Sequence, residues 1–313
     1  MHTSDAGAGT FTHDADILLE GAIDIHHHSY PEIRLDLRMR LDDAGTLAQA
    51  RAAGMAGIVL KSHLWPTMSK AYVLNQQMPG ITAYSSLTMN PIAGGFSPMA
   101  VESAARQGAR FLFFPTWGAE HDRQRGGFSK HLAHMLARNE TLAPGQGLRV
   151  TEPNGALRGD VDECLAVAAE FKLAIGTGHI SPQETMAVAE GAARHGIKEI
   201  FFQHPDSNSV KASPDEVREI AARGAVIELC ALGLLPTMQR ITPQWMLETL
   251  AAYGPEKCVL TTDSFFDWAP PAPETLRMCA AILLSLGAGK DALRGIMRDT
   301  PRRLLGLPPI GAA

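Results

Sequence analysis

The sequence predicts an α/β fold, a single (β/α)8 TIM barrel, from three observations. Eight short apolar runs alternate with segments of helical pattern, which favours a parallel sheet. The 313 residues suffice for one such barrel. Five of the runs end in ionisable residues, at the positions where barrels of this type carry function. We therefore expect one barrel domain over 1–313, with an N-terminal arm over 1–20 and a lid or hairpin insertion over 116–159 after the fourth strand.

The first expected strand, 22–27, leads into three consecutive histidines. Side chains alternate along a strand, so Asp24, His26 and His28 share one face. Two imidazoles on one face can hold one ion, since neutral imidazole is the commonest metal ligand. An exposed polar strand end or an oligohistidine tag is the alternative. The run is internal and follows an apolar strand, which argues against a tag.

Seven further strands and their helices follow in order. Serine or threonine before proline predicts several helix starts, and Ser181–Glu184 and Ser213–Glu216 are capping boxes. The expected strands are 56–63, 81–87, 110–115, 173–179, 199–204, 224–230 and 258–263. The expected helices are 43–54, 68–78, 97–107, 160–172, three that begin at 181, 213 and 242, and then 274–286 and 290–305.

Three segments depart from this alternation. Residues 1–20 read as a loose arm with a short strand at 17–19, and 31–43 as a loop over the site. Within 116–159, residues 148–158 predict a hairpin with Asn154-Gly155 as its turn. An insertion of this length is usually a lid or a specificity element, and we expect His131 and His134 on its surface.

Composition excludes several classes of function. A net charge of -5 and a pI near 6.2 argue against nucleic-acid or anionic membrane partners, and no apolar run is long enough to span a bilayer. The N-terminus lacks the pattern of a signal peptide, and the four cysteines form no Cys-x-x-Cys pair. We expect buried thiols, a cytoplasmic protein, a small-molecule substrate and, by analogy with barrels of this size, a homo-oligomer.

The polar residues at the strand exits form one candidate site. The carboxyl ends of barrel strands meet on one face, so these side chains should converge there. Imidazole and carboxylate groups in that arrangement meet the ligand needs of zinc-like ions. The residues are Asp24, His26 and His28, then Lys61 and His63, then His179, His204 and Asp263.

This set resembles the amidohydrolase superfamily of metal-dependent hydrolases. The superfamily signature Asp-x-His-x-His ends the first strand, and Gly176-Thr-Gly-His179 and Thr261-Thr-Asp263 follow in the expected order. The Lys61-Ser-His63, Gly178-His-Ile-Ser181 and Gln203-His-Pro205 motifs resemble, more narrowly, a poorly characterised branch to which no substrate is attached. The pattern matches residue by residue at His26, His28, His179, His204 and Asp263.

The resemblance implies a metal centre and a reaction class. The four histidines and Asp263 would hold one or two divalent ions, most typically zinc, with manganese, iron or cobalt as alternatives. As in relatives, His179 and His204 would both bind a second metal, or one would bind it and the other would touch substrate. Asp263 would also take a proton from the attacking water. The implied activity is hydrolysis of an amide, lactam, lactone or ester in a small, often cyclic substrate. A decarboxylase of an aromatic acid and a non-catalytic binding protein are the alternatives.

The chain departs from the superfamily at the fourth strand. Binuclear relatives carry a carboxylated lysine or a glutamate there, whereas this chain has Pro115-Thr116-Trp117. Either one metal binds without a bridge, or Lys61 is carboxylated and bridges two metals. Burial lowers a lysine pKa, which suits carbamate formation. Lys61 could instead pair with a carboxylate or bind an anionic substrate group.

Three further residues are candidates for substrate binding. His63 shares the strand phase of Lys61 and could bind substrate, ligate metal or form a structural hydrogen bond. Tyr30 and Trp117 follow strand ends, where they would line a pocket or pack under loops.

Overall fold

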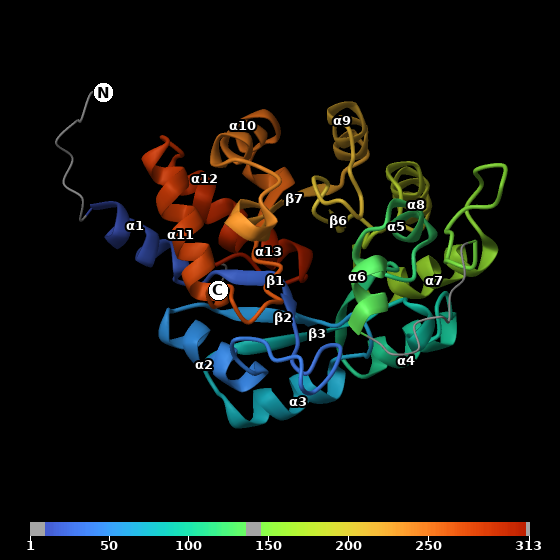
Figure 1. Ribbon diagram of the computed structural model, residues 1–313, viewed down its shortest axis with the longest axis horizontal. Coiled ribbons are helices and arrows are strands. Elements are labelled where there is room, and N and C mark those ends of the chain that lie inside the picture. The colour runs from blue at the N-terminus through green and yellow to red at the C-terminus, as the bar shows by residue number, and fades with distance from the viewer. Residues whose placement is uncertain (1–9, 136–144, 311–313) are drawn as a thin grey trace.

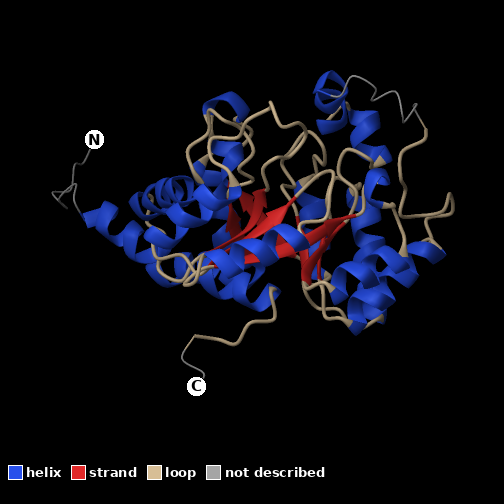
Figure 2. Cartoon of the chain, turned by 90° about the horizontal axis from the view of Figure 1, so that it is seen from below, coloured by secondary structure: helices blue, strands red, loops and turns tan. Residues whose placement is uncertain are grey.

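The computed structural model describes residues 10–135 and 145–310, and the eight strands in it form one parallel sheet in sequential order. Figure 2 shows the strands gathered at the centre with helices around them. Beyond the end of β8, Asp263 N donates to His26 O (2.8 Å) and His28 N donates to Ser264 O (3.1 Å), which joins β8 to β1. The predicted (β/α)8 barrel is therefore confirmed. The strands are β1 Ile23–His28, β2 Gly57–Lys61, β3 Thr82–Thr88, β4 Ala109–Phe113, β5 Ala174–Gly176, β6 Ile200–Phe202, β7 Val226–Cys230 and β8 Cys258–Thr261.

The helices cover the outside of the sheet (Figure 1). Both predicted capping boxes are present: Ser181 and Ser213 accept from the backbone N–H groups of Glu184 and Glu216, whose carboxylates bond back to the serine N–H groups. The helices are α1 Thr10–Leu19, α2 Asp43–Ala52, α3 Met68–Gln77, α4 Pro98–Arg106, α5 Glu120–Arg125, α6 Phe128–Met135, α7 Gly159–Glu170, α8 Pro182–Arg194, α9 Pro214–Ala222, α10 Pro243–Tyr253, α11 Ala272–Ser285, α12 Lys290–Arg294 and α13 Thr300–Leu304.

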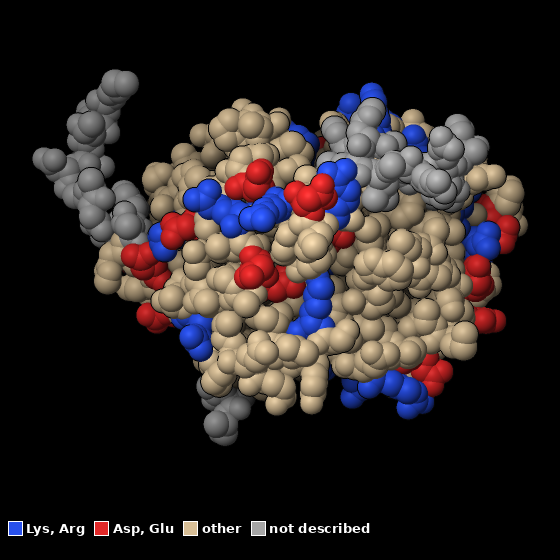
Figure 3. Space-filling view, turned by 60° about the horizontal axis from the view of Figure 1, so that its bottom comes forward, with Lys and Arg blue, Asp and Glu red and all other residues tan. Residues whose placement is uncertain are grey.

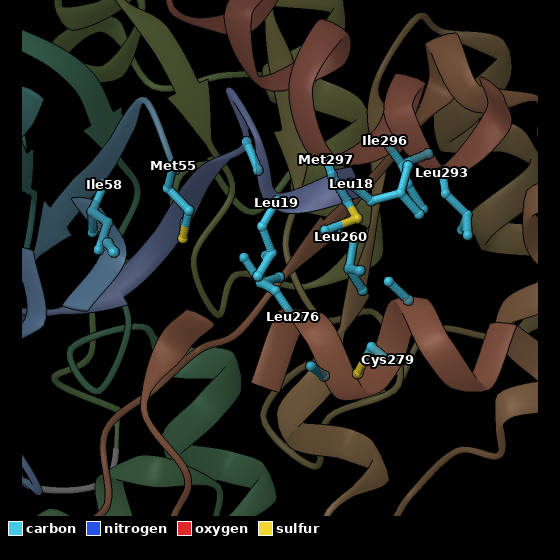
Figure 4. Close-up of a cluster of buried hydrophobic side chains, with 14 of the residues drawn as sticks. Leu18, Leu19, Met55, Ile58, Leu260, Leu276, Cys279, Leu293, Ile296 and Met297 are labelled. Carbon is cyan, nitrogen blue, oxygen red and sulfur yellow. The ribbon is translucent and has the colours of Figure 1, made fainter. Parts of the chain in front are cut away.

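Apolar side chains fill two layers, one inside the barrel and one between the sheet and the helices. Ile25, Val59 and Phe111 are buried within the barrel. A parallel sheet buries both faces, which explains why its strands read as nearly continuous apolar runs. Figure 4 shows part of the outer layer, where α1 and α11 contribute Leu18, Leu19, Leu276 and Cys279.

Two elements near the chain ends differ from the sequence predictions. The expected arm with a short strand at 17–19 is wrong from residue 10 on, because helix α1 occupies this region and packs Leu18 and Leu19 against α11, while residues 1–9 lie outside the described part of the chain. The expected helix 290–305 is interrupted by a π-helical turn, Gly295–Asp299. A Cβ at Gly295 would lie 2.7 Å from Cβ of Pro255, so the glycine permits this close contact.

The segment between β4 and α7 contains α5, α6 and a short hairpin. Thr151 and Leu157 form a single antiparallel bridge, and Glu152 N donates to Ala156 O (2.8 Å) around the turn at Gly155. The predicted hairpin is present in this reduced form. Residues 136–144 and the side chains of His131 and His134 lie outside the described part of the chain.

The surface carries charges of both signs. On the face shown in Figure 3, Lys and Arg side chains are interspersed with Asp and Glu. Within residues 10–135 and 145–310, no helix combines the length and apolar character that crossing a bilayer requires.

Candidate metal centre

The end of β1 places His26 and His28 at the carboxyl end of the barrel. Both side chains are buried, as is Asp24 two residues earlier. Asp24 does not reach the site, because it accepts from Thr262 Oγ1 and from the backbone N of His26, and thus links β1 to β8. Burial raises the pKa of Asp24 to about 6. The predicted shared face is wrong for Asp24, because the register of β1 on β2 shifts between Asp24 and His27 and Asp24 pairs with Ile58 of the outer apolar layer. The first acid of the motif is therefore a structural group, while the two histidines face the centre.

Three potential metal-ligand atoms, from His26, His28 and Asp263, lie close together. His26 Nε2 and His28 Nε2 each lie 3.1 Å from the same oxygen, Oδ1 of Asp263. Asp263 has a left-handed backbone, with φ of +48°, which non-glycine residues rarely adopt. This conformation lets the second residue after β8 turn its carboxylate back toward β1. Lys61 Nζ lies 2.9 Å from His26 Nε2 and thus joins the same cluster.

His179 and His204 approach the cluster from β5 and β6. Their ring centroids are 5.0 Å apart, and the ring of His204 lies 5.5 Å from that of His26. Gly178 has φ of +60°, and a Cβ there would lie 2.3 Å from the carbonyl oxygen of Phe114. Only glycine fits this turn, which sets the direction of His179.

Three buried carboxylates hold the imidazoles from behind, and sequence reasoning missed all three. Glu228 of β7 pairs with His26 Nδ1 (2.7 Å), Glu32 with His28 Nδ1 (3.2 Å) and Asp122 of α5 with His179 Nδ1 (3.0 Å). A carboxylate on Nδ1 fixes the ring and leaves Nε2 for the centre, which is the usual support of a metal-ligating histidine. The sequence could have indicated Glu228, because a charged residue inside an apolar strand needs a buried partner.

The electrostatics of the histidines suit a cation. Burial lowers the pKa values of His179 and His204, so these imidazoles are neutral, the form that binds metal. Burial and Lys61 also lower the pKa of His26, but Asp263 and Glu228 outweigh them and raise it to about 9. The two carboxylates thus favour a positive charge at His26. A divalent cation bound there would provide that charge in place of the proton.

The donor set therefore fits a divalent ion. His26, His28 and Asp263 bring ligand atoms within 4.8 Å of one another, and so do two groups that include Glu228 or Glu32. We assign the first group to the centre, because the oxygens of Glu228 and Glu32 face Nδ1 atoms on the far sides of the rings. Two imidazoles and a carboxylate are a common zinc ligand set.

A cavity of about 450 Å³ opens above this centre. Of the predicted substrate-binding residues, His63 lines it, with Nδ1 held by Thr116 Oγ1 (2.8 Å). Trp117 packs beneath and donates from Nε1 to His63 O (3.0 Å), so it supports His63. Tyr30 donates its hydroxyl to Leu35 O (2.6 Å) and is not part of the cavity lining. Substrate contacts by these residues stay predictions.

Solved structures with the same architecture are barrel proteins. The chain is similar to a probable dipeptidase, PvdM, from Pseudomonas aeruginosa, with 12% identity, 96% of this chain and 98% of that chain covered, and a TM-score of 0.65. An amidohydrolase from the same organism is 12% identical, with 94% of this chain and 98% of that chain covered, and a TM-score of 0.63. An amidohydrolase from Burkholderia multivorans with bound zinc is 16% identical, with 92% of this chain and 99% of that chain covered, and a TM-score of 0.55. At these identities the likeness establishes the fold, and it confirms the predicted amidohydrolase resemblance at that level.

Sequence comparison places the chain in a family. No curated protein matches the sequence. The profile of DUF6282, described as a family of unknown function, matches residues 21–228. That range runs from β1 to Glu228 and contains His26, His28, Lys61, His179 and His204, while Asp263 lies beyond it. The chain belongs to the family DUF6282.

Proposed function

We propose that this protein is a metal-dependent hydrolase that cleaves an amide, lactam, lactone or ester bond in a small cyclic substrate. The observation that carries the proposal is the meeting of His26 Nε2 and His28 Nε2 at one oxygen of Asp263. The side chain of Asp263 is 13% exposed, so part of this carboxylate reaches the cavity while the histidines are buried.

His26, His28 and Asp263 would hold a divalent ion, with His179 and His204 completing one or two sites. A bound ion of this kind supplies Lewis acidity, which activates water and polarises a carbonyl. Asp263 accepts the proton of the attacking water and delivers it to the leaving group. Imidazole and carboxylate donors favour zinc, and also accommodate manganese, iron or cobalt.

Lys61 is the candidate bridge between two ions. β4 offers no carboxylate at its end, and Glu120 accepts instead from Gly147 N (2.8 Å) within the insertion. Lys61 is fully buried, burial lowers its pKa, and its Nζ lies beside His26 Nε2. A neutral amine in this position can take up carbon dioxide to form a carbamate.

Lys61→Met is expected to reduce zinc binding from two ions per chain to one or none, because the bridging group is lost. Titration calorimetry of the metal-stripped protein gives the stoichiometry, and ¹³C NMR after incubation with labelled bicarbonate detects the carbamate. Lys70→Met is the matched control, since Lys70 contacts Ser29 Oγ and Tyr30 O outside the centre. One ion per chain in both the wild type and Lys61→Met would show that Lys61 does not bridge two metals and instead binds substrate or has a structural role.

A product assay separates hydrolysis from decarboxylation on the same barrel. The zinc-loaded protein is incubated with panels of lactones, lactams, esters, amides and aromatic acids. Acid release or ring opening without carbon dioxide supports the hydrolase. Carbon dioxide release from an aromatic acid would replace it with a decarboxylase, and no turnover across the panels favours a binding protein, since fold alone does not imply activity.

A further inference from the structure

Aromatic rings line one part of the cavity as a continuous wall. Phe128 of α6 stacks on His63, with 4.2 Å between ring centroids. Phe265 contacts Phe128 edge-on at 5.8 Å, and Phe266 contacts Phe265 at 5.0 Å. These rings present flat apolar surface beside the candidate metal centre, and flat apolar groups pack well on such surfaces.

The lining also contains polar side chains and one fixed cation, beside the apolar residues Leu232, Pro236 and Met238. Serine, asparagine, threonine and glutamine side chains from the segments after β6 and β7 face the cavity, and Arg240 lies among them. Lys61 is the other basic side chain of the lining, but it is engaged at His26. An arginine keeps its charge in every protein environment, so Arg240 gives this part of the cavity a permanent positive group.

The guanidinium of Arg240 is held in one orientation. Nε donates to Asp206 Oδ2 (2.9 Å) and Nη1 donates to Met238 O (3.4 Å). Among residues 10–135 and 145–310, Nη2 has no hydrogen-bond partner. The side chain is 15% exposed and Asp206 is 7% exposed, so the pair is largely withdrawn from bulk water. A guanidinium fixed in this way can direct its remaining donors at a planar anion with little loss of entropy.

We propose that the substrate carries a carboxylate that binds Arg240, in addition to the bond that is cleaved, and a flat apolar body that packs on Phe128 and Phe265. This inference rests on the proposed hydrolase function and names its substrate class, a compact ring-bearing carboxylic acid. The cavity volume of about 450 Å³ is within the range of small-molecule sites, so a substrate of this size fits.

A purely structural ion pair is the competing explanation. Asp206 and Arg240 join the segments after β6 and β7, and this alone could account for their contact. The two explanations differ in one measurable quantity, the preference for an acid over its neutral amide. With a structural pair, any preference for the acid does not depend on Arg240, whereas a charge-assisted hydrogen bond from Arg240 favours the acid by about tenfold or more.

The test is calorimetric binding of benzoate, phenylacetate and 3-phenylpropionate, each beside its amide, to the zinc-loaded full chain. We expect at least one acid to bind about tenfold more tightly than its amide in the wild type. Arg240→Gln should reduce this ratio to about twofold or less, because glutamine can still bond to Asp206 but carries no charge.

The double variant Asp206→Asn/Arg240→Gln repeats the test without leaving the charge of Asp206 buried and unpaired. It therefore provides the result if Arg240→Gln alone does not fold. Arg240 also lines a neighbouring cavity, together with Asp206 and Arg218. Arg218→Gln is the matched control, because Arg218 lines that cavity and not this one, so an acid preference lost in Arg218→Gln would place the acid in the neighbouring cavity and overturn the proposal. An acid preference that survives in the double variant would overturn the proposal, since the acid would then bind at the metal centre. Equal binding of every acid and its amide in the wild type would also overturn it.

Binding is measured with compounds that have no bond to hydrolyse, apart from the control amides. A protein that prefers the acids through Arg240 but hydrolyses nothing would refute the proposed reaction and leave the carboxylate subsite intact. A hydrolase without this preference would refute only the subsite.

Discussion

Asp263→Asn is expected to reduce turnover by about three orders of magnitude, the effect typical of removing a general base. The asparagine side chain keeps an oxygen at the position that His26 Nε2 and His28 Nε2 approach. It cannot accept the proton of the attacking water at neutral pH. The zinc site should therefore persist while catalysis is lost, and steady-state kinetics on a hydrolysed substrate with parallel zinc analysis measure both.

Asp267→Asn is the control for this experiment. Asp267 is exposed on the same segment after β8 and is not part of the cavity lining, so its substitution should leave turnover and zinc content unchanged. An Asp263→Asn protein that keeps zinc and more than about a tenth of the wild-type turnover would show that another group moves the proton.

Asp122→Ala is expected to weaken zinc binding by about 10- to 100-fold, the usual cost of losing a carboxylate behind a ligating histidine. Asp122 accepts from His179 Nδ1 (3.0 Å) and from the backbone N–H groups of Phe128 (2.9 Å) and Ser129 (2.6 Å). One buried carboxylate thus ties the start of α6 to a candidate ligand. Without it, His179 loses its fixed orientation, and competition with a zinc chelator measures the change in affinity.

Glu120→Ala separates this effect from general loosening of the insertion. Glu120 is buried on the same helix and accepts from Gly147 N (2.8 Å) and Gln124 Nε2 (2.9 Å), but from no histidine. We expect its zinc affinity to stay within about twofold of wild type, since only partners of ligating residues tune a metal site. If Asp122→Ala raises KM and leaves zinc affinity unchanged, His179 contacts substrate and does not ligate metal.

The positions of the site residues could be predicted because barrel geometry is simple. A polar residue that ends an apolar run must lie at the carboxyl end of the sheet, which places His26, Lys61 and Asp263 in one region without any knowledge of side-chain packing. The same reasoning set the eight strands to within a few residues. Alternation did not reveal that Asp24 bonds to Thr262, because the register of β1 on β2 shifts between Asp24 and His27, and this irregularity breaks the strict alternation of side chains.

The supporting carboxylates could not be predicted in the same way. Glu32 lies in an irregular segment and Asp122 in a short helix between β4 and α7. Neither segment has a sequence periodicity from which the direction of its side chains could be predicted. Their roles depend on which histidine nitrogen they meet across the fold, at separations of 4 and 57 residues. Trp117 illustrates the same limit, since its position after β4 did not show that it packs beneath His63.

Elemental analysis of protein purified without chelator, beside a His26→Ala/His28→Ala variant, tests most directly whether the strand ends form a metal centre. The account predicts one or two divalent ions per chain in the wild type and their loss in the variant. Absence of metal from the wild-type protein, even after reconstitution with zinc, would contradict it.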